Sequence, residues 1–315
     1  MAKQRLPFLL LLQVWLQLAA AHSIVEFLPG FKGPLPFHLE TGYVGVDDQA
    51  EEVQLFYYFI KSQRNPRDDP LLLWLTGGPG CSALSALVLQ IGPVNFEVSS
   101  IIFLDLPVGT GFSYARTPLA RQRSDFKQVS HAEQFLRKWL ADHQEFLANP
   151  VYIAGDSYSG KIVPAIAQNI SDGNNDGIKP LINVKGYILG NPITDPTFDF
   201  NSRIPFAHGM GLISDELYQS LKKSCAGEYQ TIKPSNADCL RNVEAFHKSY
   251  VHFLLIYWAN DDNVRKALHV REGSIEEWKR CNYKLPYTQE IKSSVKFHID
   301  LGIKGYRRLI YRLFG

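Results

Sequence analysis

The stretch from residue 151 to residue 160, with the sequence VYIAGDSYSG, restricts the possible folds of this chain more than any other segment. Its first four residues predict a short buried strand, and the small residues after them predict a sharp turn into a helix. A serine in such a turn, in the pattern Gly-x-Ser-x-small, is typical of a nucleophile elbow, although Ser159 stands where a second glycine is more common. The amino end of the helix would provide positive potential beside an oxyanion. We therefore interpret Ser157 as a candidate nucleophile.

A glycine-rich turn earlier in the chain supports this interpretation. Residues 77–80 read GGPG and follow a continuous apolar run, LLLWL, at residues 71–75. In folds with a nucleophile elbow, the oxyanion hole combines the amide after the nucleophile with an amide from an early strand loop. Tyr158 and Gly78 fit these two roles.

The order of predicted elements indicates the fold class. Strands are predicted at residues 54–60, 71–75, 101–104, 151–154 and 184–189, and helices at residues 125–147 and 161–170. Strands that alternate with helices, with glycine loops at the strand ends, predict an α/β fold with a mostly parallel sheet. From about residue 206 to residue 250 the sequence becomes polar and contains two nearby cysteines. We interpret that segment as a small cap-like insertion rather than a second domain.

The amino-terminal residues 1–21 predict a signal peptide. Lys3 and Arg5 form a charged start, an apolar run follows, and three alanines at residues 19–21 provide a cleavage site. A membrane anchor is the alternative, but it requires about 20 predominantly apolar residues, and Gln13 and Gln17 interrupt this shorter run. We therefore expect residues 22–315 to form a secreted domain, extracellular or vacuolar, without membrane attachment after cleavage.

The charge balance excludes two classes of protein. The chain has 33 basic and 31 acidic residues among 315, and 45% of its residues are hydrophobic. A strongly basic nucleic-acid-binding protein and an acidic disordered tail would both show a large imbalance. We expect a globular domain that does not bind nucleic acid.

Export changes how the four cysteines are interpreted. Cys81, Cys225, Cys239 and Cys281 are an even number, and none forms a CxxC pair. In an oxidising compartment this favours disulfides over zinc binding, and three pairings are possible. The sequence Asn-Ile-Ser at residues 169–171 makes Asn169 a predicted glycosylation site.

Three long motifs indicate ancestry: WLTGGPGCS at residues 74–82, FLDLPVGTGFSY at 103–114 and GDSYSG at 155–160. Together with shorter stretches at 40–43, 190–192 and 258–262, they resemble the serine carboxypeptidase family, above all its plant carboxypeptidase-like branch. The resemblance covers nearly the whole mature chain. It implies an α/β-hydrolase fold, Ser157 as nucleophile, and the Gly78 and Tyr158 amides as the oxyanion hole. It also implies the disulfides Cys81–Cys281 and Cys225–Cys239, and no cofactor or metal.

The family's carboxylate-binding positions differ in this chain. The resemblance places substrate contacts at Thr76, Gly77, Gln90 and Asp156, where the family has Asn at the first position and Glu at the last two. A buried carboxyl pair with raised pKa can donate hydrogen bonds to a substrate's carboxylate at acidic pH. Thr76 and Asp156 resemble plant members that transfer an acyl group from a glucose ester to an alcohol. We expect carboxypeptidase-type hydrolysis of a peptide or small ester, with this acyl transfer as the alternative.

The remaining triad residues are the second departure. The resemblance implies an Asp just beyond a strand at residues 306–311 and a His much later, whereas this sequence ends at Gly315. We therefore expect a truncated product that lacks the carboxyl-terminal part of the fold, and a catalytically inactive homologue is a further alternative. Substitute bases and partners after Ser157 would come from His208, His247, His252, His269, His298, Asp261, Asp262 and Asp300. In a strand, His298 and Asp300 would share a face. The sequence does not specify an oligomeric state.

Overall fold

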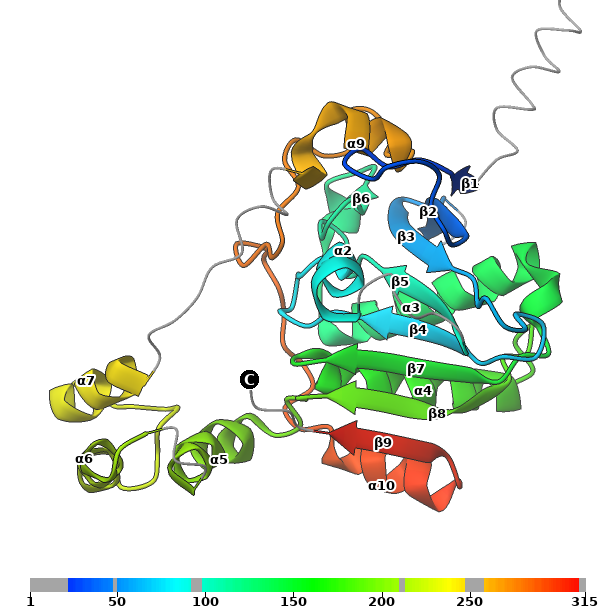
Figure 1. Cartoon of the computed structure of the whole chain (residues 1–315). Coiled ribbons are helices and arrows are strands. Elements are labelled where there is room, and N and C mark those ends of the chain that lie inside the picture. Colours follow the sequence, from blue (N-terminus) through cyan, green and yellow to red (C-terminus); the bar gives the residue numbers. More distant parts are fainter. Residues whose placement is uncertain (1–21, 48–49, 92–97, 210–212, 247–257, 312–315) are drawn as a thin grey trace, which may run out of the picture.

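The computed structural model describes residues 22–47, 50–91, 98–209, 213–246 and 258–311 (Figure 1). The predicted signal peptide at residues 1–21, together with His247 and His252, lies outside the described residues. Within those ranges, no helix combines the length and the apolar character needed to cross a membrane.

One mixed sheet organises the described part of the chain. Its strands lie in the order β1-β2-β3-β5-β4-β7-β8-β9, and β6 pairs with β3. Strands β5, β4, β7, β8 and β9 are parallel to one another, whereas β1, β2, β3 and β6 form antiparallel pairs. The bounds are β1 His22–Val25, β2 Leu39–Val46, β3 Val53–Ile60, β4 Leu71–Leu75, β5 Ser100–Leu104, β6 Tyr114–Ala115, β7 Val151–Asp156, β8 Val184–Gly190 and β9 Arg307–Tyr311. The predicted mostly parallel sheet is confirmed.

Strands β2, β3 and β5 are buried on both faces, which explains the continuous apolar runs of β3 and β5, whereas every residue of the edge strand β9 is exposed. Successive side chains of β3 alternate between two core layers: Tyr57 and Phe59 pack on one side, and Phe56 and Tyr58 on the other. Trp139 of α3 packs edge-on against Phe59, with ring centroids 4.9 Å apart. Each large apolar side chain buried in this way stabilises the fold by about 1.5–3 kcal/mol.

Helices cover the sheet on both faces (Figure 1). The first core layer receives side chains from α3, α4 and α10, and the second receives them from α2 and α9. The bounds are α2 Ala83–Ser85, α3 Asp125–Asp142, α4 Ser159–Asn175, α5 Pro196–Gly209, α6 Asp215–Cys225, α7 Ala237–Phe246, α9 Asp262–Ala267 and α10 Val295–Ile303. A π-helix, η1 Ala86–Ile91, and two 3₁₀ helices, η2 Leu119–Arg121 and η3 Gln144–Phe146, complete the described helical segments. The helix predicted for residues 125–147 ends at Asp142, because His143 has a non-helical backbone before the turn η3.

Helices α5, α6 and α7 lie beside the sheet rather than on it (Figure 1). They share a small apolar cluster that includes Ile204, Leu221 and Tyr229. The disulfide Cys225–Cys239 joins α6 to α7. This group occupies the position of the insertion predicted from about residue 206, although its helical structure already begins at Pro196. A capping role for it stays a prediction.

Candidate active site

Ser157 lies between the end of β7 and the start of α4, as the elbow motif predicts. Its φ angle is +52°, a left-handed conformation that costs a non-glycine residue of the order of 1–3 kcal/mol. Three backbone hydrogen bonds hold it there. The Ser157 amide donates to the Gly190 carbonyl at 3.1 Å, and its carbonyl accepts from the amides of Ile193 at 2.7 Å and Gly160 at 3.0 Å. The strained turn is therefore fixed by its surroundings.

Two glycines permit the close approach of strand and helix at this turn. A Cβ atom on Gly155 would lie 2.5 Å from the Leu75 carbonyl oxygen, and one on Gly160 would lie 2.4 Å from the Cβ of Pro192. Neither position has room for a side chain. The side chain of Ser159 is accommodated because Gly155 leaves space for it, since a Cβ at Gly155 would lie 2.8 Å from the Ser159 Cβ. This explains why serine can replace the more common glycine of the motif.

The glycine loop after β4 packs directly against the elbow. A Cβ atom on Gly77 would lie 2.7 Å from both the Tyr158 amide nitrogen and the Ser157 Cβ. Gly78 has a φ angle of +119°, which favours glycine. The structure therefore brings the loop of Gly78 beside the amide of Tyr158. Their joint role as oxyanion donors stays a prediction.

A disulfide fastens this glycine loop to a distant segment. Cys81 is bonded to Cys281, the pairing that the resemblance implies. On either side of it, the Ser82 amide donates to the Arg280 carbonyl at 2.7 Å, and the Asn282 amide donates to the Gly80 carbonyl at 2.8 Å. Covalent and hydrogen bonds thus restrain the loop that contacts Ser157.

Sequence reasoning missed Asp125, the first residue of α3, as a support of the site. Its buried carboxylate accepts hydrogen bonds from the Tyr158 hydroxyl at 2.8 Å and the Tyr287 hydroxyl at 2.6 Å. It also accepts from the amides of Glu290 and Ile291. Burial, together with the Asp125 charge, raises the pKa of Tyr158. Asp125 therefore fixes the side chain of a predicted oxyanion-hole residue, and only its position at a helix start was visible in the sequence.

The predicted substrate-binding residues gather around Asp156. One carboxylate oxygen of Asp156 accepts from the Gly77 amide at 3.0 Å, and the other accepts from the Gln90 side-chain amide at 3.3 Å. Burial raises the pKa of the Asp156 carboxyl, while these two hydrogen bonds lower it. Thr76 accepts a hydrogen bond from the Trp74 indole at 3.2 Å. The structure thus unites Gly77, Gln90 and Asp156 beside Ser157, and their contact with substrate stays a prediction.

The sequence profile of the serine carboxypeptidase family matches residues 29–253 and 247–312. Serine carboxypeptidase-like 3 from Arabidopsis thaliana is 50% identical over an alignment of 332 positions, which covers 92% of this chain and 75% of the relative. Serine carboxypeptidase-like 2 from the same plant is 52% identical with the same coverage. This chain belongs to the serine carboxypeptidase family.

The solved structure of KEX1(delta)p, a prohormone-processing carboxypeptidase from Saccharomyces cerevisiae, shares the fold. Its TM-score is 0.68 at 20% identity, with 88% of this chain and 73% of that chain covered. The profile match and the Arabidopsis relatives confirm the family predicted from the motifs at residues 74–82, 103–114 and 155–160, and the solved structure supports the fold. They also confirm the predicted α/β-hydrolase fold.

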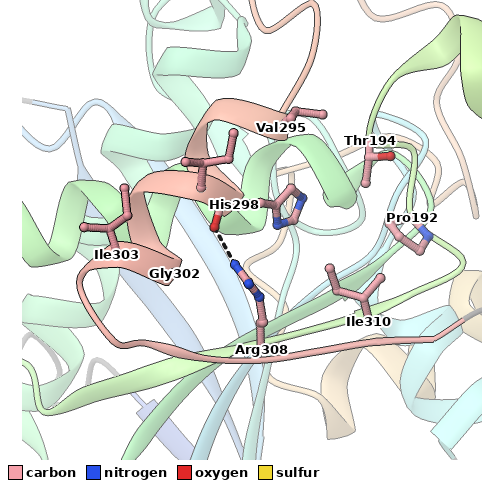
Figure 2. Close-up of a pocket in the computed structure, with 9 residues that line it drawn as sticks. Pro192, Thr194, Val295, His298, Gly302, Ile303, Arg308 and Ile310 are labelled. Carbon is pink, nitrogen blue, oxygen red and sulfur yellow. Dashed lines mark hydrogen bonds between the residues drawn. The ribbon is translucent and has the colours of Figure 1, made fainter.

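The described histidines that could replace the catalytic base form hydrogen bonds with residues other than Ser157. His208 stacks on Tyr218 and lies 2.6 Å from the Asp215 carboxylate. His298 lies in a groove of about 700 Å³ between α10 and β9 (Figure 2), where its ring bonds to the Tyr187 hydroxyl at 2.6 Å. In the part of the chain that the structure describes, no hydrogen bond joins the Ser157 hydroxyl to a histidine.

The acidic candidates are also placed away from a triad. Asp261 caps the amino end of α9, where it accepts hydrogen bonds from Asn263 and Val264, and Asp262 is the first residue of that helix. Asp300 pairs with Lys296 along α10. The idea that His298 and Asp300 share a strand face is wrong, because both lie in a helix, where two residues' separation turns the side chain by roughly 200°. His269 follows α9 with a φ angle of +55°.

Asn169 lies within α4 rather than in a loop. Its side-chain amide donates a hydrogen bond to Glu133 of α3. A glycan on Asn169 would replace this contact between the two helices. Glycosylation there stays a prediction.

Proposed function

We propose that this chain performs carboxypeptidase-type chemistry through an acyl-enzyme on Ser157, with a peptide or small ester as substrate. The observation that supports this best is the elbow itself, with Ser157 at a φ angle of +52° and the Gly77 loop packed against it. The Ser157 hydroxyl oxygen would attack the substrate carbonyl carbon, and the Gly78 and Tyr158 amides would stabilise the oxyanion. The bond to the leaving amine or alcohol then breaks, and water attacks the acyl-enzyme to release the acid.

The proton of Ser157 needs an acceptor in this sequence of steps. Among the described residues, no hydrogen bond joins the Ser157 hydroxyl to His208 or His298, whose rings bond to Asp215 and Tyr187. Attack would then depend on water as the base. The proposal therefore includes slow acylation. If acylation were too slow to measure, the chain would be the catalytically inactive homologue that the sequence leaves as an alternative.

Prolonged incubation with a fluorophosphonate should give one covalent adduct, located on Ser157 by mass spectrometry. The elbow places this hydroxyl beside the Gly77 loop. In the labelling step the Ser157 oxygen bonds to phosphorus and fluoride leaves, and the loop should stabilise this phosphonylation as it would acylation. Ser157→Ala should remove the adduct, whereas Ser220→Ala, at an exposed serine of α6, should keep it. An adduct on another serine, or none on a chain that unfolds cooperatively, would refute Ser157 as the nucleophile.

Acyl transfer to an alcohol is the second candidate, and the contacts of Asp156 favour it. Its carboxylate already accepts from the Gly77 amide and the Gln90 side chain. A neutral amide at Gln90 cannot form the carboxyl pair that would share a proton and donate to a substrate carboxylate. Among the described residues, Gln90 and Asp156 therefore do not form the proton-sharing pair that would favour a free carboxyl terminus over an ester.

Restoring the pair should change the substrate preference. We expect the double variant Gln90→Glu/Asp156→Glu to raise peptide carboxyl-terminal cleavage at acidic pH, relative to transfer from benzoyl-glucose to glycerol, by about tenfold or more. Chromatography of both products measures the ratio, and Asp156→Glu alone serves as the control because it leaves Gln90 neutral. An unchanged ratio would show that these residues do not select the substrate.

We also propose that the chain is exported. The two disulfides, Cys81–Cys281 and Cys225–Cys239, support this, because such bonds are rare in reducing compartments. Together with the predicted signal peptide at residues 1–21, they favour an extracellular or vacuolar destination.

A further inference from the structure

Three side chains of types that can bind metal ions lie together at the edge of the sheet opposite β9. His22 comes from β1, Glu40 from β2, and His143 follows α3. Their ligand atoms all lie within 4.8 Å of one another. Glu40 and His143 are buried, and His22 is half-buried. Strands β3, β5 and β4 separate this cluster from β7 and Ser157.

The hydrogen bonds of His143 determine which of its nitrogens can bind a cation. Its Nδ1 lies 2.9 Å from the Trp139 carbonyl oxygen, which can only accept, so Nδ1 carries a proton. The ring also stacks on the Trp139 indole at 3.9 Å. Its Nε2 then faces the Glu40 carboxylate at 3.0 Å. A nitrogen lone pair and a carboxylate this close need a cation between them, either a proton or a metal ion.

The other two side chains have binding capacity left. Glu40 Oε1 accepts from the Tyr57 hydroxyl at 2.7 Å and is also the oxygen that faces His143 Nε2, whereas no described residue donates a hydrogen bond to Oε2. The His22 ring lies 5.0 Å from the His143 ring, between centroids, and makes no hydrogen bond within the described part of the chain. The cluster therefore offers two imidazole nitrogens and one carboxylate oxygen.

We propose that His22, Glu40 and His143 bind one Zn²⁺ ion, with water as a fourth ligand. Two nitrogens and one carboxylate oxygen are a common zinc ligand set, and tetrahedral bonds of about 2.0–2.1 Å place ligand atoms about 3.3 Å apart. The 3.0 Å between His143 Nε2 and Glu40 is close to that separation. His22 has to approach further, which its half-buried position in an edge strand allows.

The surroundings of the cluster resemble the outer contacts of zinc sites. Metal-binding histidines commonly donate their second N–H to a backbone carbonyl, and ligating carboxylates accept a further hydrogen bond. The Trp139 carbonyl and the Tyr57 hydroxyl supply these two contacts. Bound zinc would fasten β1 to β2 and to the end of α3. The cysteine arguments against a zinc site do not apply, because this site uses none.

Metal titration of the secreted chain tests the proposal. After removal of metal with a chelator, ZnCl₂ competition against a chromophoric indicator should show one tight site. CoCl₂ should give the visible absorption bands of tetrahedral Co²⁺. His22→Ala should weaken zinc binding by more than about 100-fold, and Tyr57→Phe by about 10–100-fold, as for other outer contacts.

His38→Ala is the matched control, since His38 is a half-buried histidine outside the cluster. Its zinc affinity should equal that of the unchanged chain. Equal affinities of His22→Ala and His38→Ala would overturn the proposal, as would the absence of micromolar binding. Glu40→Gln separates binding at the cluster from binding by His22 alone, since His22 is the first residue after the predicted signal peptide. If it kept full affinity while remaining folded, the three-ligand site would be refuted.

Discussion

Labelling of Ser157 by a fluorophosphonate should be on the order of 10⁴-fold slower than labelling of a serine hydrolase with a complete triad. The hydroxyl of Ser157 has no hydrogen bond to an imidazole among the residues that the structure describes, and the prediction assumes that its proton goes to water. The elbow and the Gly77 loop are in place, and they keep the rate above that of free serine.

The rate is measured by gel fluorescence over time, with chymotrypsin labelled in parallel. Thermal unfolding of the same sample shows that the chain is folded. A rate within tenfold of chymotrypsin would contradict the prediction and reveal an activated hydroxyl. His247→Ala and His252→Ala would then show whether a histidine outside the described residues provides the base.

The parallel half of the fold could be predicted because its signals are local. Strands β4, β5, β7 and β8 are short apolar runs that end in turns, and the elbow residues are adjacent in the sequence. Strand β2 was missed because it contains Glu40, Thr41 and Gly42. These polar residues are buried through distant partners: the Thr41 hydroxyl donates to the Leu268 carbonyl, and Glu40 faces His143. Such partners have no sequence signal.

The candidate site was likewise predictable where its signals are local and not where distant residues meet. The motif at residues 155–160 predicted the turn, and the structure places Gly77, Gln90 and Asp156 around it. Asp125 was not predicted, because its bond to Tyr158 spans 33 residues. His298 and Asp300 were considered as strand neighbours, but residues 295–303 pack as a helix against α4. The sequence of such a short segment does not show whether it forms a helix or a strand when tertiary contacts determine its conformation.

Asp105→Ala should destabilise the fold by at least about 4 kcal/mol, because it would leave four hydrogen-bond donors without an acceptor, each at about 1–3 kcal/mol. The Asp105 carboxylate directly follows β5 and is fully buried. One oxygen accepts from the Ser82 hydroxyl at 2.7 Å and the Ala83 amide at 2.8 Å. The other accepts from the Phe112 amide at 3.0 Å and the Tyr58 hydroxyl at 3.3 Å.

These donors come from the start of α2, from Phe112 directly after the glycine loop at residues 109–111, and from β3, so one carboxylate joins three segments. A Cβ atom on Gly111 would lie 2.0 Å from Asp105 Oδ2, so the carboxylate packs directly against this loop. Urea unfolding measures the loss. Asp238→Ala, at an exposed residue of α7, is the control and should change stability by less than about 0.5 kcal/mol. A similar small loss at Asp105 would show that water replaces the missing acceptor.

The same carboxyl should make stability depend on pH. Burial raises the pKa of Asp105 from 3.8 to about 6, although its four hydrogen bonds act in the opposite direction. Between these values the folded chain binds a proton that the unfolded chain does not. This group's contribution therefore increases stability as pH falls from 7 towards 4, by up to about 3 kcal/mol. Asp105→Asn cannot titrate, so its unfolding free energy should lack this increase in urea titrations at each pH. Parallel pH profiles for the two chains would mean that the hydrogen bonds outweigh burial and hold the carboxylate ionised throughout.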